Sequence, residues 1–171
     1  SIMLVNRNAS EGAQAANDLS TLYRTKVVSF GADITEKEQT EAMATLAMDT
    51  FGKIDILINS AGINIRGAID EVTPDDFIKV MDVNVTGTWL ACRAVVPHMK
   101  KNASGKIINL ASTLGLVGLS NRTPYASSKG AVVQMTRALA LELAPFNINV
   151  NAICPGPFLT EMNKSISESS D

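Results

Sequence analysis

Short apolar runs alternate with longer amphipathic stretches along the whole chain, and this alternation constrains the fold more than any other feature. The apolar runs have the length of strands, and the stretches between them have the period and length of helices. Strands are expected at Ile2–Val5, Lys26–Phe30, Lys53–Ile58, Lys106–Leu110 and Asn147–Ile153, and helices at Ser10–Leu22, Thr35–Phe51, Thr73–Lys100 and Pro124–Leu143. This order predicts an α/β fold with a doubly wound parallel sheet, in a single domain over residues 1–171.

Two helix starts carry recognisable capping residues. Ser10, followed by Glu11, is expected to cap the first helix. Thr73, followed by Pro74, is expected to open the long third helix.

Composition excludes several classes of function. The chain is 46% hydrophobic and 19% charged, which is typical of a soluble globular protein. Its formal net charge of -2 gives no basic field for nucleic acid or for a membrane surface. No apolar run approaches the roughly 18 to 20 residues of a membrane span. We therefore expect a cytoplasmic protein whose partner is a small molecule.

Metal binding and disulfide formation are not expected either. The chain has one histidine, which cannot form a ligand cluster by itself. Cys92 and Cys154 both lie in apolar runs, where a buried reduced thiol is the expected state.

Polar residues follow each expected strand. Parallel α/β sheets bind ligands at the carboxyl ends of their strands, so these positions are candidate site residues. They are Asn6 and Arg7, Asp33, the run Asn59-Ser60-Ala61-Gly62, Ser112, and Pro155-Gly156 with Thr160 beyond them. The sequence therefore predicts one ligand site along a single edge of the sheet.

Tyr125 and Lys129, in the stretch YASSK, form the most informative pair. Four residues make about one helical turn, so the two side chains share a face near the start of a helix. A phenol ordinarily keeps its proton at neutral pH, and a nearby ammonium favours the phenolate. The pair is therefore suited to proton transfer at a substrate oxygen.

Taken together and in this order, the motifs resemble those of the classical short-chain dehydrogenase/reductase family over nearly the whole chain. They are YASSK at 125–129, NSAG at 59–62, Asn84 in DVNVTG, Ser112 in NLAST, Asp33 in ADIT and the Pro-Gly element in PGPFLT. Ser112 stands thirteen residues before Tyr125, close to the family spacing. The segments GINIRGAIDEVTPDDF and PGPFLTEMN are similar to gluconate 5-dehydrogenase-like and 3-oxoacyl-reductase-like members.

The resemblance implies a Rossmann-like oxidoreductase that transfers a hydride between NAD(P) and a secondary alcohol or ketone. It implies that Tyr125 is the acid/base, that Lys129 also holds the nicotinamide ribose, and that Ser112 bonds the substrate oxygen. Asn84 is similar to the residue that holds a water between the lysine and solvent. The implied cofactor-binding residues are Arg7, Asp33, Ile34, Asn59, Ala61, Gly62, Tyr125, Lys129, Pro155, Gly156 and Thr160.

The residues after the strand expected at Ile2–Val5 indicate which cofactor is used. An acid there bonds the ribose hydroxyls of NAD, whereas this chain has the neutral Asn6 followed by Arg7, and an arginine accommodates the phosphate of NADP. NADP is favoured, and NAD stays open.

Simpler interpretations remain beside these. Asp33 is also a candidate cap for the helix that begins at Thr35, and Asn59 and Gly62 are also turn formers after a strand. Ser60 stands where the family has a second asparagine, which puts one supporting hydrogen bond in doubt.

Two parts of the family pattern have no counterpart in the sequence. These are the first strand with its T-G-x-x-x-G-x-G turn, and the substrate lobe after the Pro-Gly element. We therefore expect the middle of a longer enzyme, whose sheet is incomplete at both ends. The missing strand would lie between the strands at Ile2–Val5 and Lys53–Ile58, which would either pair directly or leave the chain poorly folded.

Two hypotheses follow from this. The first is the active oxidoreductase, as a homodimer or homotetramer through its two long helices, for which Trp89, Val95, Val96, Val133 and Met135 supply apolar side chains. The second is a catalytically silent truncated chain that serves as a subunit or binding module.

Overall fold

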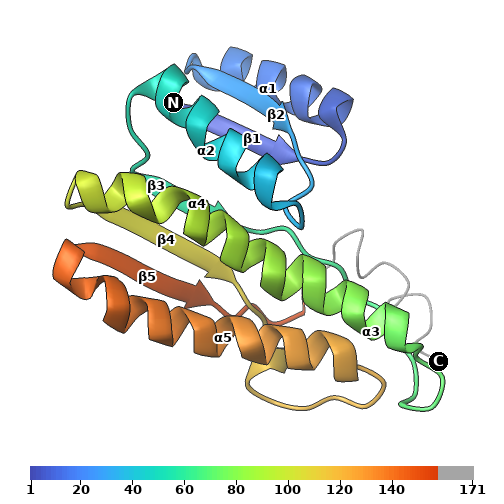
Figure 1. Ribbon diagram of the computed structural model, residues 1–171. Coiled ribbons are helices and arrows are strands. Elements are labelled where there is room, and N and C mark those ends of the chain that lie inside the picture. The colour runs from blue at the N-terminus through green and yellow to red at the C-terminus, as the bar shows by residue number, and fades with distance from the viewer. Residues whose placement is uncertain (158–171) are drawn as a thin grey trace.

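The computed structural model describes residues 1–157 and confirms an α/β architecture of parallel strands and packed helices (Figure 1). The strands are β1 (Ile2–Asn6), β2 (Val27–Gly31), β3 (Ile56–Asn59), β4 (Gly105–Leu110) and β5 (Ile148–Ile153). The helices are α1 (Ala9–Tyr23), α2 (Lys37–Phe51), α3 (Pro74–Met81), α4 (Gly87–Lys101) and α5 (Thr123–Leu143). Short 3-10 turns lie at Thr113–Gly115 and Ala144–Phe146.

Helix caps explain where α1 and α3 begin. Thr73 caps α3 as expected, because its hydroxyl accepts a hydrogen bond from the Asp76 amide and Pro74 occupies the first turn. The expected cap of α1 was wrong by two residues. Asn8, not Ser10, accepts from the backbone amide of Glu11, and the Ser10 hydroxyl donates to the Asn8 side chain.

The long third helix differs from its prediction in one local feature. Between α3 and α4 the backbone forms a π-helical turn over Asp82–Thr86 instead of a continuous α-helix. Such turns insert an extra residue into a helix and are frequent at functional sites. Here the turn contains Asn84, whose side chain is buried.

The strands form two separate parallel sheets, with the orders β1-β2 and β3-β4-β5. β1 pairs with β2 from Ile2 opposite Val27 to Asn6 opposite Gly31. β4 lies at the centre of the second sheet and pairs with β3 on one side and with β5 on the other. The four strand ends at Asn6, Gly31, Asn59 and Leu110 therefore lie toward one edge of the molecule, as the sequence predicted.

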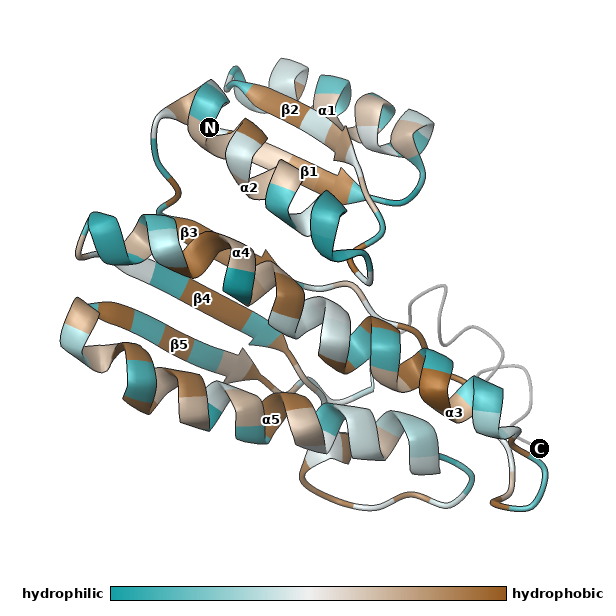
Figure 2. Cartoon of the chain, viewed as in Figure 1, coloured by the Kyte–Doolittle hydropathy of each residue, from teal (hydrophilic) through white to brown (hydrophobic). Residues whose placement is uncertain are grey.

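A slot separates β1 from β3, so the expected direct pairing of these two strands is not found. The strands do not pair directly with each other. Instead, both line a cavity of about 740 Å³, together with side chains of α2 and α4 that include Met43 and Val95. Ile56 and Ile58 of β3 are 58% and 59% exposed, which is unusual for apolar residues of a parallel strand. Figure 2 shows apolar strands on both sides of this slot.

The main hydrophobic core lies between the sheet β3-β4-β5 and its helices, and residues of the sheet β1-β2 also pack against it. Met99, Ile107, Leu143 and Ile148 are fully buried in it, and Met3, Val5 and Phe30 of the first sheet pack against it. An ion pair of 3.0 Å between Arg93 of α4 and Glu41 of α2 adds a surface contact between helices. The helices, rather than strand pairing, thus hold β1 and β2 against the rest of the chain.

The cysteines agree with the expectation of free thiols in apolar surroundings. Cys92 is buried and Cys154 half-buried, both as free thiols, and burial raises the pKa of the Cys92 thiol to about 11.

Within residues 1–157, no helix combines the length and the apolar character that crossing a bilayer requires.

Candidate active site

Tyr125 and Lys129 lie on the first turns of α5, where Pro124 is buried and fixes the start of the helix. The ammonium of Lys129 lies 5.6 Å from the centre of the Tyr125 ring, so the two side chains share a face as predicted. Lys129 is 5% exposed, and its Nζ donates a 2.6 Å hydrogen bond to the carbonyl of Leu110. Burial lowers the pKa of Lys129 below its usual value. The lysine is therefore fixed between α5 and the end of β4.

The Asn84 side chain, in the π-helical turn, is fixed by hydrogen bonds to Ile63 and Ser128. Its Nδ2 donates to the carbonyl of Ile63 at 3.0 Å and to the hydroxyl of Ser128 at 2.9 Å. Its Oδ1 accepts from the amide of Ile63 at 2.8 Å. The asparagine therefore joins the loop after β3 to α5, which is a bridging role that the sequence did not reveal.

Ser128 is a site residue that the sequence interpretation missed. It is completely buried, accepts from Asn84, and donates to the backbone carbonyl of Tyr125 at 2.8 Å. Its place inside the YASSK motif was visible, but Ser127 beside it is exposed, and no spacing rule distinguishes the two. Ser128 connects the Asn84 side chain to the turn of helix that carries Tyr125.

Ser112 lies two residues beyond β4 and caps the 3-10 turn, because its hydroxyl accepts from the amide of Leu114 at 3.1 Å. The turn packs tightly on α5 at Gly115. A side chain at Gly115 would approach the backbone carbonyl carbon and oxygen of Lys129 to 2.7 Å. This close approach, which only a glycine permits, keeps the Ser112 turn against the helix turn of Lys129.

The loop after β3 begins with the NSAG element and runs beside the lysine. A Cβ at Gly62 would lie 3.2 Å from Asn84 Oδ1 and 3.5 Å from Lys129 Nζ, so bare backbone faces the lysine there. Asn59 has a different task. Its Nδ2 donates to the side chain of Asn109 at 2.9 Å and lies 3.3 Å from the Cys92 sulfur. Its side chain thus stabilises the strand end, while Ala61 is exposed in the loop.

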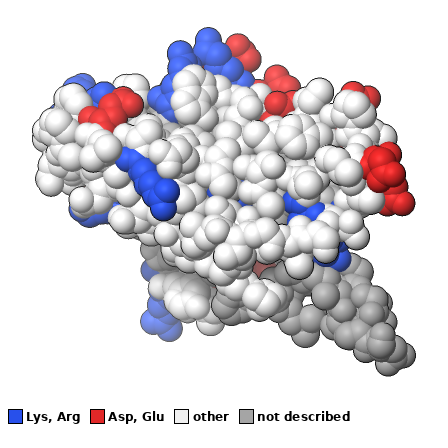
Figure 3. Space-filling model, turned by 90° about the horizontal axis from the view of Figure 1, so that it is seen from below, with Lys and Arg blue, Asp and Glu red and all other residues white. Residues whose placement is uncertain are grey.

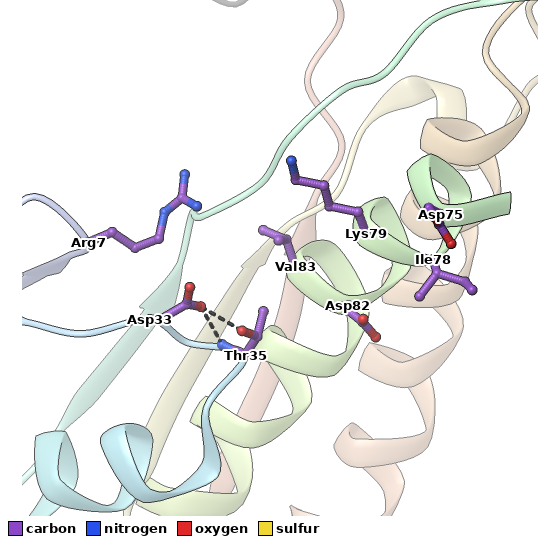
Figure 4. A pocket seen from close by; sticks show the side chains of 8 residues that line it. All are labelled: Arg7, Asp33, Thr35, Asp75, Ile78, Lys79, Asp82 and Val83. Atoms are coloured by element: carbon purple, nitrogen blue, oxygen red, sulfur yellow. Dashed lines mark hydrogen bonds between the residues drawn. The ribbon is translucent and has the colours of Figure 1, made fainter. Parts of the chain in front are cut away.

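A pocket of about 350 Å³ lies near Arg7 and Asp33, at the edge of the molecule where the strands end (Figure 4). Asp33 accepts from both the amide and the hydroxyl of Thr35, at 2.9 and 2.7 Å. These hydrogen bonds lower the pKa of the Asp33 carboxyl, and the positive charge of Arg7 lowers it to a smaller extent. The simpler interpretation of Asp33 as a helix cap is wrong, because Glu36 occupies the N-cap position of α2.

One wall of this pocket comes from α3 and the π-helical turn that follows it, and it was not predicted. Its residues are Asp75, Ile78, Lys79, Asp82 and Val83. Their spacing in the sequence places them on one face of a helix. Which strand end this face meets depends on the tertiary structure, so the sequence could not show it. Arg7 and Lys79 approach the pocket from opposite sides (Figure 4).

The remaining predicted residues lie at two further places. Ile34 packs with its side chain against Gly87 of α4, where a Cβ on the glycine would meet Ile34 Cδ1 at 2.6 Å. Pro155 accepts a hydrogen bond from the amide of Thr113 at 3.0 Å, so the Pro-Gly element lies beside the Ser112 turn. Gly156 faces open space. Thr160 lies outside the described residues.

Metal ligation is not offered by the described part of the chain. Across residues 1–157, no three His, Cys, Asp or Glu side chains come together as a ligand group. The polar groups brought together are instead a phenol, an ammonium, hydroxyls and an asparagine, which suits proton transfer and hydrogen bonding to a substrate oxygen.

Comparison with known proteins identifies the class of protein that this fold and site define. The family model described as short chain dehydrogenase matches residues 1–171, and the chain belongs to this family. A 2-(R)-hydroxypropyl-CoM dehydrogenase of Xanthobacter autotrophicus is 42% identical over 145 residues, which are 83% of this chain and 58% of the relative. A 5-keto-D-gluconate 5-reductase of Escherichia coli is 36% identical over 166 residues, 97% of this chain and 65% of the relative.

Solved structures agree with this assignment. A gluconate 5-dehydrogenase from Burkholderia cenocepacia, in complex with NADP and tartrate, superposes with a TM-score of 0.93 at 32% identity, over 98% of this chain and 66% of that protein. An NAD+-bound xylitol dehydrogenase superposes with a TM-score of 0.88 at 35% identity, over 90% of this chain and 59% of that protein. The chain thus spans about half to two thirds of the length of the proteins it matches.

Proposed function

We propose that the natural protein is an oxidoreductase that transfers a hydride between NADP and a secondary alcohol or ketone, with Tyr125 as general acid/base. The observation that carries this proposal is the connected arrangement of Tyr125 and Lys129 on one helix face, with Lys129 fixed to the end of β4. Membership of the short chain dehydrogenase family supports it. Relatives named as dehydrogenases and reductases of hydroxyl and keto compounds support the reaction class.

The described residues fit a nicotinamide cofactor at this edge. Gly62 leaves bare backbone against Lys129, and the pocket near Arg7 and Asp33 offers both a cation and a carboxylate. The residues proposed to hold the cofactor are Arg7, Asp33, the backbone at Ile34, Asn59, Ala61 and Gly62, then Tyr125, Lys129, Pro155, Gly156 and Thr160. Arg7 favours NADP, and the two solved structures named above hold NADP in one case and NAD+ in the other. When bound, the nicotinamide supplies or accepts the hydride.

The chain's own residues then have separable tasks. The Tyr125 phenol gives a proton to the substrate oxygen during ketone reduction and takes it back during alcohol oxidation. Lys129 stabilises the phenolate through its nearby positive charge. The Ser112 hydroxyl holds the substrate oxygen as charge develops on it. Asn84, through Ser128, fixes the helix turn of Tyr125 and lies close to Lys129 on the path that a proton would take toward solvent.

Replacement of the phenol oxygen tests the proposed reaction. In the natural protein, Tyr125→Phe is expected to lower turnover of a panel of racemic secondary alcohols by about 10² to 10⁴, with NADP binding nearly unchanged by fluorescence titration. Tyr23→Phe, at an exposed tyrosine on α1, is the matched control and is expected to keep full turnover. Near-normal turnover of Tyr125→Phe would reject the assignment.

The second candidate function is a silent subunit or binding module, and the slot between β1 and β3 is the observation that favours it. A split sheet holds its strand ends less rigidly than a continuous one, and catalysis depends on precise positioning. The candidates differ in cofactor binding. Titration of the natural protein with NADP is expected to saturate for the enzyme and to show no binding for the silent subunit.

We also propose a homodimer or homotetramer, although its basis differs from the prediction. Val95 and Val133 are 2% and 8% exposed and belong to the chain's own core, so they are unavailable to a partner. Trp89 on α4 is 48% exposed and Leu141 on α5 is 81% exposed. The face on the α5 side carries few charged side chains over its middle (Figure 3). Light scattering that reports a monomer at micromolar concentration would reject the oligomer.

A further inference from the structure

A chain of hydrogen bonds runs from the ends of β3 and β4 to α5. Asn59 and Asn109 stand opposite each other in these strands, and Asn59 Nδ2 donates to Asn109 Oδ1 at 2.9 Å. Asn109 Nδ2 donates in turn to the hydroxyl of Thr136 at 2.9 Å. That hydroxyl donates to the carbonyl of Val132, about one turn earlier in α5, at 2.7 Å. The chain therefore connects two strand ends to the helix of the proposed acid/base.

Burial allows this chain only one arrangement. Asn109 is 0% exposed and Thr136 is 5% exposed, so water is not at hand to replace a lost partner. The hydroxyl proton of Thr136 is used within α5, and its oxygen can therefore serve Asn109 only as an acceptor. Asn109 is then satisfied in one orientation, with Nδ2 toward Thr136 and Oδ1 toward Asn59. A buried amide without a partner is costly, so the chain favours a single packing of α5 on the sheet.

The residue after Asn109 holds the proposed catalytic lysine. The carbonyl of Leu110 accepts from Lys129 Nζ at 2.6 Å, which is the one hydrogen bond that this ammonium makes within residues 1–157. Two neighbouring residues of β4 thus hold α5, one at Lys129 and the other at Thr136. These helix positions are seven residues apart, close to two full turns, so they lie on one face of α5.

The other end of the chain reaches the loop that runs beside the lysine. Asn59 is the last residue of β3 and the first of the NSAG element. Three residues further on, a Cβ at Gly62 would lie 3.5 Å from Lys129 Nζ. The same hydrogen-bond chain therefore relates the start of this loop to the helix that carries Lys129.

The polar contact, rather than the apolar packing beside it, fixes the position of α5 along the sheet. The buried apolar residues at this contact include Ala111, Val132 and Val133. Apolar contacts are non-directional and tolerate a small rotation or slide of a helix, whereas a hydrogen bond weakens steeply with distance and angle. A shift of α5 that broke the bond at Thr136 would also move Lys129 relative to the end of β4.

We propose that Asn109 and Thr136 are positioning residues for the proposed reaction. Their hydrogen bond sets the register of α5 against the ends of β3 and β4. It thereby places the Tyr125 phenol and the Lys129 ammonium relative to the loop after β3, where the cofactor is proposed to bind. This inference rests on the proposed function for its link to turnover. The register itself is a property of the packing and can be measured without any reaction.

Two substitutions of Thr136 separate its hydroxyl from its shape. In the natural protein, Thr136→Val keeps the shape but removes the acceptor for Asn109, so kcat for secondary alcohols should fall at least about tenfold with KM little changed. Thr136→Ser keeps the hydroxyl and should retain most of kcat. Thr40→Val is the matched control, because Thr40 is 1% exposed and its hydroxyl donates to the Lys37 carbonyl of its own helix. This control should leave kcat unchanged.

Asn109→Leu tests the same bond from the other side and should also lower kcat. The double variant Asn109→Leu/Thr136→Val should lose no more kcat than the more impaired single variant, because both changes break one bond. Losses that multiply would show that the two residues act separately and would overturn the proposal. Melting curves confirm that each variant is folded, and Asn109→Leu carries the test if Thr136→Val does not fold.

Hydrogen exchange gives a readout that needs no turnover. In Thr136→Val, the amides of residues 126–136 should exchange at least about tenfold faster while those of α2 stay unchanged, and Thr40→Val should do the reverse. If no form of the protein oxidises any alcohol but this exchange pattern is found, the positioning role stands and the proposed reaction is wrong. If exchange in α5 is unchanged in Thr136→Val, or if this variant loses no more kcat than Thr40→Val, the positioning role is wrong.

Discussion

The Nδ2 of Asn84 donates a 2.9 Å hydrogen bond to the hydroxyl of Ser128, and so joins the π-helical turn to the helix that carries Tyr125 and Lys129. The two residues stand 44 positions apart in the chain. Ser128 passes the connection on to the Tyr125 carbonyl. The position of the proposed acid/base thus depends on a buried polar contact between two helices.

Removal of the Ser128 hydroxyl should weaken this contact. Ser128→Ala leaves Asn84 Nδ2 with the Ile63 carbonyl alone, and we expect the free energy of unfolding to fall by about 1 to 3 kcal/mol. We also expect a lower kcat, because the helix turn of Tyr125 is less well positioned. Denaturant unfolding and steady-state kinetics measure the two effects. Ser127→Ala, at the exposed neighbour, should change neither; equal effects of the two substitutions would contradict the bridging role.

Arg7 should set the choice between cofactors. In the natural protein, Arg7→Asp removes a cation from the pocket and adds a carboxylate beside Asp33, so NADP should lose on the order of 2 to 3 kcal/mol of affinity relative to NAD. The ratio of kcat/KM for the two cofactors measures the shift. Arg137→Asp makes the same change of charge on α5 and should leave the ratio unaltered. An unchanged ratio in Arg7→Asp would make Arg7 a surface residue without a role in cofactor choice.

Gly115 should tolerate no side chain. The Cβ of Gly115→Ala would lie 2.7 Å from the backbone of Lys129, and backbone atoms of a helix cannot move aside as a flexible side chain can. We expect a loss of about 1 to 3 kcal/mol in the free energy of unfolding, and lower turnover because the Ser112 turn moves away from α5. Thermal melting and kinetics are the measurements. Gly118→Ala, where a Cβ meets nothing within 4 Å, is the control, and a stable, fully active Gly115→Ala would refute the close approach.

The slot between β1 and β3 should weaken the 171-residue chain when it is produced alone. Two strand edges and the apolar side chains of Ile56 and Ile58 face this slot, so we expect shallow unfolding with an m value below that of a continuous sheet of the same length. A soluble peptide with a central run of valines should sharpen the transition by pairing with both edges. The same peptide with a central proline should not. Cooperative unfolding that neither peptide alters would show that the split sheet is stable as it stands.

Periodicity alone was sufficient to predict the α/β class and the order of the strands and helices. Each strand is a short apolar run, and each helix carries its repeat over several turns, so both signals are local. Most boundaries were correct within one or two residues. The exception is β3, expected from Lys53 but observed from Ile56, because pairing with β4 begins only after the Lys106 amide bonds to the Asp55 carbonyl. Strand ends depend on a partner strand, which local sequence does not contain.

The chemistry of the candidate site was also visible in the sequence, because Tyr125 and Lys129 act through their residue types and their spacing of one turn. Ser128 and the wall that α3 and the π-helical turn give to the Arg7 pocket were not visible. Each depends on which buried face meets which loop, and that is set by how helices pack across the sheets. The local sequence therefore determined the elements and the reactive groups, whereas only the tertiary structure decided which distant groups touch, because burial and long-range hydrogen bonds arise only when the whole chain packs.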